Sequence, residues 1–145
     1  QQIVAVEIHE PFFANLRASC EKYGSRVQVV HADYFKTRAP SDSPFSIAVI
    51  NPPYQKFLDV RFVEKTLKDA ISVAALLLGS SLHNSKRAKV WNAARITKID
   101  FLAKRPNAFE NGKPIIFKPQ REYVRVMADR ETGNGSTHSP LVTLA

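Results

Sequence analysis

The chain has little cysteine and no long apolar run. Cys20 is its single cysteine among 145 residues, so an internal disulfide bond and a zinc site built from several thiolates are both excluded. The same scarcity favours a reducing compartment, and we expect a cytoplasmic protein. No apolar stretch approaches the roughly 20 residues of a membrane-spanning helix, and the N-terminus shows no signal-peptide pattern. The four histidines share no metal-ligand spacing, so we expect neither a membrane partner nor a bound metal.

Positive charge is what the chain has in excess. Lysine and arginine number 21 against 13 acidic residues, which gives a net charge of +8. This charge favours a polyanionic partner, nucleic acid first, although a generally basic surface would carry it equally well. Six cations of the C-terminal half could contact phosphates or form a solvated surface. They are Lys86, Arg87, Lys89, Lys98, Lys104 and Arg105.

Short apolar segments alternate with amphipathic ones along most of the chain. Strands are predicted at 3–8, 26–33, 45–50 and 72–78, weaker strands at 96–103 and 121–128, and helices after Pro11 and over 60–71 and 85–94. This alternation predicts an α/β sheet with right-handed crossovers, in which the run at 3–8 is buried on both faces. The segment from Thr132 is rich in Gly, Ser and Thr. We therefore predict a domain over 1–131 and a flexible tail over 132–145.

Acidic side chains close the first two predicted strands. Ligands of open α/β sheets bind at the carboxyl ends of the strands, and Glu7 and Asp33 stand at such ends. Glu7 could accept hydrogen bonds from both hydroxyls of a ribose, or lie near the positive end of the helix that follows. Asp33 could accept from the exocyclic amine of an adenine, or be a simple turn or cap residue. Because a single helix separates the two strands, both acids are expected at the same edge of the sheet.

The sequence Asn51-Pro52-Pro53-Tyr54 directly follows the apolar strand at 45–50, which we expect to be buried. An amine conjugated to a base ring is a poor nucleophile, because its lone pair is delocalised into the ring. The Asn51 side-chain oxygen and the Pro52 carbonyl can accept its two hydrogens, and the prolines keep these acceptors in place. Tyr54 offers a flat face for a base taken out of its stack. A strand terminator with an incidental Asn and Tyr is the alternative, and the position after two strand-end acids favours the catalytic interpretation.

These segments resemble the class I S-adenosylmethionine-dependent methyltransferases, in particular the amine-methylating group with an Asn/Asp-Pro-Pro-aromatic motif. "VAVEIHEPFFANLRA" is similar to the family's second strand with its ribose-binding acid, Glu7, and "VVHADYF" to the segment whose acid, Asp33, binds the adenine of the cofactor. The resemblance also places Ile8, Tyr34 and Asn51 at the cofactor. "VINPPYQ" is similar to the catalytic motif, and "LLLGSSLHNSKRAKVWN" and "KRPNAFENGKP" resemble phage and prophage adenine-specific DNA methyltransferases.

The resemblance implies a fold, a cofactor and a reaction. The fold is a Rossmann-like three-layer sandwich with a mostly parallel sheet and a C-terminal antiparallel hairpin. The cofactor is S-adenosyl-L-methionine, and the reaction is methylation of the exocyclic amine of adenine in DNA, as in restriction-modification, with Asn51, Pro52, Pro53 and Tyr54 as catalytic residues. Methylation of guanine in RNA, methylation of a protein glutamine amide, and a catalytically inactive nucleic-acid-binding domain are the alternatives.

One departure from the family pattern lies at the N-terminus. The family's first strand and its Gly-rich loop should come just before Ile3, and neither is in this chain. We therefore expect a fragment of the full enzyme. Because that loop carries the methionine part of the cofactor, we also expect these 145 residues alone to bind S-adenosylmethionine weakly or not at all.

Overall fold

The computed structural model describes residues 2–39, 43–83, 85–102, 109–110, 113–114, 122–130 and 141–144. The chain divides into two compact units, which we call the N-terminal unit (Gln1–Arg38) and the C-terminal unit (Ala39–Ala145). No helix in the described ranges is both long and apolar enough to cross a membrane.

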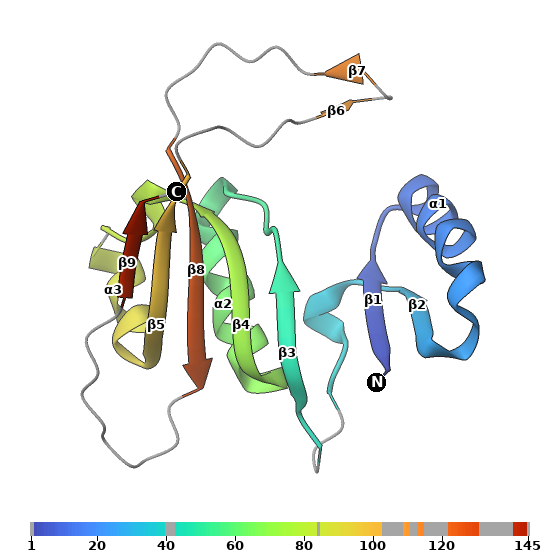
Figure 1. Cartoon of the computed structure of the whole chain (residues 1–145), viewed down its shortest axis with the longest axis horizontal. Helices are drawn as coiled ribbons and strands as arrows, with labels where there is room; N and C mark the ends of the chain where they lie inside the picture. The colour runs from blue at the N-terminus through green and yellow to red at the C-terminus, as the bar shows by residue number, and fades with distance from the viewer. Residues whose placement is uncertain are drawn as a thin grey trace. The chain divides into compact units, whose positions relative to one another are not determined.

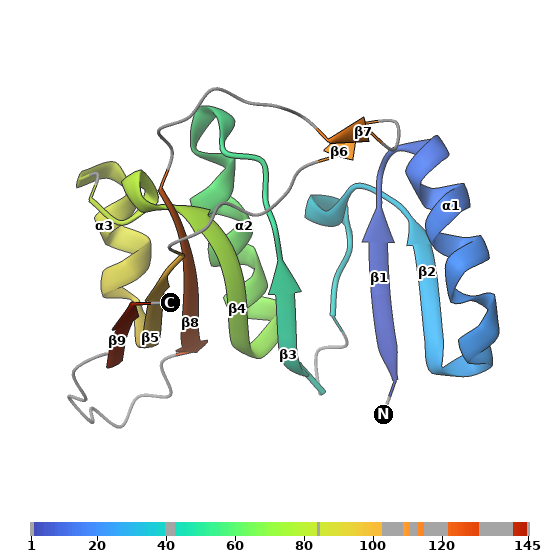
Figure 2. The same cartoon turned by 45° about the horizontal axis from the view of Figure 1, so that its top comes forward.

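The N-terminal unit consists of two parallel strands joined by a helix (Figure 2). Strand β1 (Ile3–Glu7) pairs with β2 (Val27–His31) in a register that sets Glu7 opposite His31. Helix α1 (Glu10–Cys20) has a proline in its first turn, as the sequence predicts, because a proline there loses no helical hydrogen bond. A 3-10 segment follows at Glu21–Arg26, where Gly24 has a φ of 57° that glycine adopts without a steric penalty.

The predicted burial of β1 on both faces is wrong. None of its five residues is buried, and Ile3 is 57% exposed. Within the described part of the chain β1 pairs with one strand only, β2, and within its unit the single α-helix α1 packs beside the pair. An apolar strand with this little cover keeps much of its side-chain surface in contact with water.

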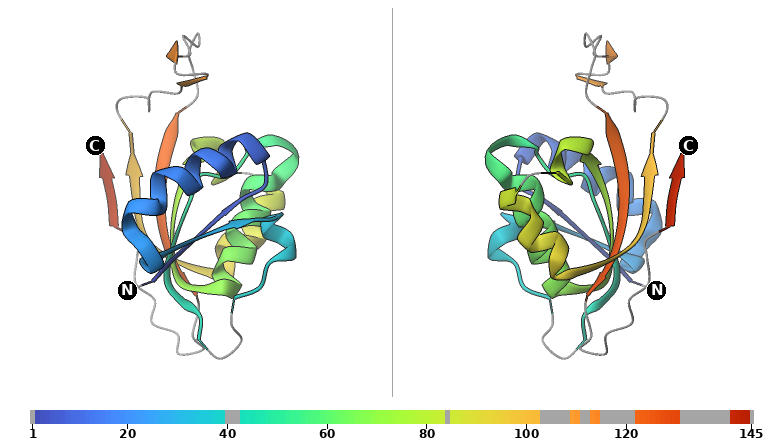
Figure 3. Two further views of the ribbon diagram at one scale, coloured as in Figure 1. Left: turned by 90° about the vertical axis from the view of Figure 1, so that its right-hand side faces the viewer. Right: turned by 90° about the vertical axis from the view of Figure 1, so that its left-hand side faces the viewer.

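The C-terminal unit is built on a five-stranded sheet in the order β3-β4-β8-β5-β9 (Figure 1). Strands β3 and β4 are parallel, β8 runs antiparallel to both β4 and β5, and β9 is parallel to β5. The strands are β3 (Phe45–Ile50), β4 (Ala70–Leu78), β5 (Ala94–Phe101), β8 (Tyr123–Arg130) and β9 (Leu141–Leu144). Helices α2 (Leu58–Asp69) and α3 (Ser85–Asn92) lie on one side of this sheet (Figure 3), and a two-stranded ladder joins β6 (Phe109–Glu110) to β7 (Lys113–Pro114).

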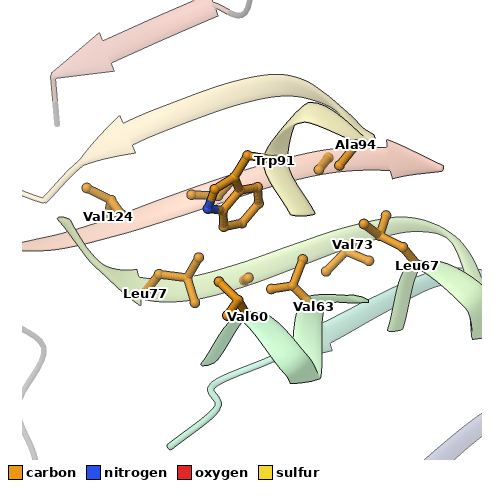
Figure 4. Close-up of a cluster of buried hydrophobic side chains, with 11 residues drawn as sticks. Val60, Val63, Leu67, Val73, Leu77, Trp91, Ala94 and Val124 are labelled. Atoms are coloured by element: carbon orange, nitrogen blue, oxygen red, sulfur yellow. The ribbon is translucent and has the colours of Figure 1, made fainter. Parts of the chain in front are cut away.

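The core lies between the two helices and the sheet (Figure 4). Alternate residues of the central strands are buried, because successive side chains of a strand point to opposite faces and one face is covered by the helices. Each fully buried apolar side chain of this kind stabilises the fold by roughly 1.5–3 kcal/mol relative to exposure. The core includes Val60, Val63 and Leu67 of α2, Val73, Ala75 and Leu77 of β4, Val124, Val126 and Ala128 of β8, and Trp91 of α3.

The structure confirms the predicted fold class, with parallel α/β pairs and an antiparallel pair of β5 and β8 near the C-terminus. Two sequence predictions need correction. The strand before the proline pair is not buried, since Ile47 is 47% and Val49 is 80% exposed. Strand β9 was not anticipated, and it lies within the segment 132–145. The predicted boundary at residue 131 is outside the described residues.

Candidate functional site

The Asn51–Tyr54 segment leaves the carboxyl end of β3 and leads through a short 3-10 turn into α2. Asn51 and Pro53 are exposed, Pro52 is buried and Tyr54 is half-buried. The buried Pro52 anchors the segment to the protein while the Asn51 side chain stays accessible to a ligand. The predicted role of the Asn51 side-chain oxygen as an acceptor requires this accessibility.

The hydroxyl of Tyr54 lies 2.9 Å from the Asn51 side-chain oxygen, to which it donates a hydrogen bond. The same hydroxyl lies 3.3 Å from the Leu76 carbonyl oxygen, and the Tyr54 ring meets Tyr123 edge-on at 6.0 Å between centroids. Burial raises the pKa of Tyr54 to about 12, with smaller contributions from Tyr123 and Asp59. The phenol therefore keeps its proton at neutral pH and remains a hydrogen-bond donor that fixes the Asn51 amide.

Two consecutive residues after Tyr54 have left-handed backbone conformations. Lys56 has φ 50° and ψ 37°, and Phe57 has φ 61° and ψ 19°. Such a conformation costs a residue other than glycine roughly 1–2 kcal/mol, because Cβ approaches a backbone oxygen. The sequence holds no signal for it, since left-handed residues are normally Gly, Asn or Asp.

A buried carboxylate lies just beyond this turn. Asp59, in the first turn of α2, is 0% exposed and accepts a hydrogen bond from the Ser81 hydroxyl. The guanidinium of Arg87 pairs with it, with Nη2 at 3.3 Å from Oδ1 and 3.2 Å from Oδ2. Arg87 also stacks over the Phe57 ring at 4.8 Å, and Trp91 donates from Nε1 to the Ser81 carbonyl at 2.9 Å.

This cluster corrects the interpretation of one predicted surface cation. Arg87 points inward, with a side chain only 13% exposed, and is neither a phosphate contact nor part of a solvated face. Lys98 pairs with the buried Asp100 at 3.1 Å. Lys104 and Arg105 lie outside the described residues. Asp59 was missed from sequence because its partner stands 28 positions away along the chain.

The two predicted cofactor acids lie at the same end of the β1–β2 pair. Glu7 ends β1, and its Oε1 accepts from the His9 backbone N–H at 2.7 Å. Asp33 follows β2 and caps the 3-10 turn Tyr34–Lys36, accepting from the Phe35 N–H at 3.0 Å. Each carboxylate thus has the local backbone role that was weighed as the alternative, and each is oriented by that bond.

Two of the other three predicted cofactor residues, Ile8 and Tyr34, stand beside these acids, and the third, Asn51, follows β3. Ile8 is 53% exposed, and its carbonyl lies 2.9 Å from Nε2 of His31. Tyr34 opens the short turn after Asp33. These residues and the two acids belong to the N-terminal unit, whereas Asn51–Tyr54 belong to the C-terminal unit, so the contacts given above hold within each unit.

No protein-family model matches the chain. No curated protein matches it significantly either. Solved structures do match. A Listeria monocytogenes protein assigned to the class I S-adenosylmethionine-dependent methyltransferases superposes on 99% of the chain, with a TM-score of 0.71 and 12% identity.

Two further structures carry names of RNA-modifying enzymes. A Pyrococcus horikoshii protein named as an RNA methyltransferase matches 89% of the chain with a TM-score of 0.65 and 14% identity. The 23S rRNA methyltransferase ErmE matches 90% with a TM-score of 0.62 and 14% identity. The chain has a methyltransferase-type Rossmann-like fold. It spans 49%, 63% and 53% of the lengths of these three structures.

Three of the predicted residues stand at or just after the carboxyl ends of parallel strands. In such sheets ligands bind outside the carboxyl ends of the parallel strands. Glu7 ends β1, Asp33 follows β2 and Asn51 follows β3, each of which is parallel to a neighbouring strand. The three side chains therefore occupy the type of position at which this fold binds ligands.

Proposed function

We propose that the chain carries the catalytic segment of an S-adenosylmethionine-dependent methyltransferase that modifies the exocyclic amine of adenine in DNA. The observation that carries the proposal is the exposed Asn51 amide at the carboxyl end of β3, held by Tyr54 and followed by two prolines. The fold supports it, because this sheet position binds ligands in open α/β proteins. The substrate class rests on the motif and on the resemblance of the downstream segments.

Asn51 and Pro52 would accept hydrogen bonds from the amine of the substrate. An amide oxygen has two lone pairs, and the Tyr54 hydroxyl uses one of them. The second can accept one amine hydrogen, and the Pro52 carbonyl can accept the other. Two fixed acceptors draw the nitrogen toward a tetrahedral shape, so that its lone pair is free to attack.

The side chains at the end of the β1–β2 pair fit the nucleoside part of the cofactor. Glu7 offers a carboxylate to ribose hydroxyls and Asp33 offers one to the adenine amine, and a backbone N–H orients each acid. Ile8 and Tyr34 would flank the adenosine. When bound, the cofactor would supply an electrophilic methyl group, so that a C–N bond forms as the S–C bond breaks and the amine then loses a proton to solvent.

RNA is the second candidate substrate. Two structural neighbours are named as RNA methyltransferases, and a net charge of +8 suits either nucleic acid. A protein glutamine amide is less well matched by this charge. A catalytically inactive domain that only binds nucleic acid would transfer no methyl group in the assay described next.

The test is a methyl-transfer assay of the full-length protein with DNA, RNA and a glutamine-containing protein as parallel substrates. We expect transfer to adenine in DNA. Asn51→Ala should lower kcat by about 100-fold or more while the Kd for S-adenosylmethionine stays nearly unchanged, because the lost acceptor acts on the amine. Asn92→Ala, an exposed residue at the end of α3, is the matched control and should behave as the parent. Equal turnover in Asn51→Ala and the parent would refute the role of Asn51, and transfer only to RNA would reassign the substrate.

A further inference from the structure

The left-handed turn after Tyr54 is held by contacts from a distant helix. Lys56 and Phe57 both have positive φ, and successive strained residues persist only where the surrounding structure holds them. Phe57 immediately precedes α2, and its ring lies under the Arg87 guanidinium at 4.8 Å. Arg87 belongs to α3, so the contact joins two elements far apart in the sequence.

Arg87 is fixed at three points around this turn. It stacks on Phe57, pairs with Asp59 two residues further on, and donates from Nη1 to the Ser80 carbonyl at 3.3 Å. The Ser81 hydroxyl, in the turn that follows β4, donates a hydrogen bond to the same carboxylate. The loop after β4 and the turn after Tyr54 are thereby joined through one guanidinium and one carboxylate.

The Nε atom of Arg87 is buried and makes no hydrogen bond within the described part of the chain. A guanidinium selected only for polar contacts would satisfy this donor, because a buried unpaired N–H is costly. The central carbon of the guanidinium lies over the Phe57 ring, 4.8 Å from its centroid, so the group makes an aromatic contact as well as its polar contacts.

We propose that Arg87 is a positioning residue for the Asn51–Tyr54 segment. By holding Phe57 and Asp59 it fixes the turn that follows Tyr54, and with it the direction in which the Asn51 and Tyr54 side chains are presented. The proposal rests on the methyl-transfer function and deepens it. Loss of Arg87 should reduce the rate of the chemical step without changing affinity for the cofactor, since the predicted cofactor acids lie in the N-terminal unit.

Three variants separate positioning from folding. Arg87→Met removes the cation and leaves Asp59 buried without it, so it can lose stability. The double variant Arg87→Met with Asp59→Asn removes both buried charges and retains an acceptor for Ser81. Arg87→Lys keeps the charge but not the planar group that stacks on Phe57. Asn92→Ala, at an exposed position at the end of the same helix, is the matched control.

Amide hydrogen exchange over residues 51–58 gives a readout that does not depend on activity. The Leu58 N–H donates to the Gln55 carbonyl across the turn, so release of the turn should expose it. We expect exchange in this segment to rise about tenfold in the folded double variant and in Arg87→Lys, and to stay unchanged in Asn92→Ala. Parental exchange rates in a folded double variant would overturn the proposal.

The kinetic readout uses the full-length protein. The double variant should lose about tenfold to 100-fold in kcat with an unchanged Kd for S-adenosylmethionine, and Arg87→Lys should fall between it and the parent. A folded double variant with parental kcat would also overturn the proposal. If the parent itself transfers no methyl group, the proposed function fails, and the exchange measurement still decides whether Arg87 holds the turn.

Discussion

The two units of the chain differ in how much they bury. The C-terminal unit has a continuous apolar core in which Leu77 and Val124 are 0% exposed. The described residues of the N-terminal unit include no buried side chain, and Phe12 on its helix is 63% exposed. Both units have alternating strands and helices, so a shared sequence pattern does not imply equal stability. Because burial of apolar surface is the main favourable term in folding, we expect only the C-terminal unit to fold on its own.

This difference separates two groups of predicted residues. The proposed amine acceptor Asn51 and the Arg87 cluster belong to the unit with the core, whereas Glu7 and Asp33 belong to the unit without one. Elements that bury little open locally at low free-energy cost. Cofactor binding should therefore depend on conditions that order the N-terminal unit, while the geometry of Asn51 should follow the stability of the core.

The largest effect is expected from separating the units. A polypeptide of residues 39–145 should unfold cooperatively in urea, because it retains the entire core, whereas a peptide of residues 1–38 should show no cooperative transition. Circular dichroism during urea titration checks both. A sharp, reversible transition of the 1–38 peptide would break the comparison, since it would mean that this unit has sufficient burial of its own.

An intermediate effect on the free energy of unfolding is expected when one large apolar side chain of each unit is truncated in turn. Leu77→Ala should lower the free energy of unfolding by about 2–5 kcal/mol, because it leaves a cavity in a fully buried position. Phe12→Ala, at a position 63% exposed, should change it by about 0.5 kcal/mol or less. Urea midpoints and m-values of the whole chain measure both variants. Comparable losses would show that Phe12 is covered in solution.

Much of the fold was predictable from local patterns in the sequence. The apolar run at 45–50 matches β3, and the helix predicted at 60–71 corresponds to α2. Such features depend on neighbours within a few positions, where periodicity is informative. The place of Asn51 at the end of a strand was predictable for the same reason.

The features that were not predictable depend on distant contacts. Nothing near Lys56 or Phe57 in the sequence signals a positive φ, and the contact that Phe57 makes is with Arg87 of another helix. The Arg87–Asp59 pair joins residues that are remote in sequence, and the charge of Arg87 alone had favoured a surface role. The exposure of Val49 likewise reflects what covers a strand, which its own apolar sequence does not specify.

The smallest effect is the acid dependence of stability, and it arises in the C-terminal unit. Arg125, through its hydrogen bond, lowers the pKa of Asp100 against the opposing effect of burial, and Lys98 adds to the lowering. Burial raises the pKa of Asp129, but hydrogen bonds from Arg95 and Ser72 outweigh it and leave that pKa below its usual value.

A carboxyl whose pKa is lower in the folded state stabilises the fold above its unfolded pKa of about 3.9, and this contribution is lost as the pH falls through the folded value. The urea midpoint of residues 39–145 should therefore decline below about pH 4. Asp100→Asn should lower the midpoint at pH 7 and flatten that decline. Glu64→Gln, which removes a surface pair with Lys68, should leave both nearly unchanged and serves as the control. A decline equally steep in Asp100→Asn would show that the acid sensitivity originates outside the Asp100–Arg125 pair.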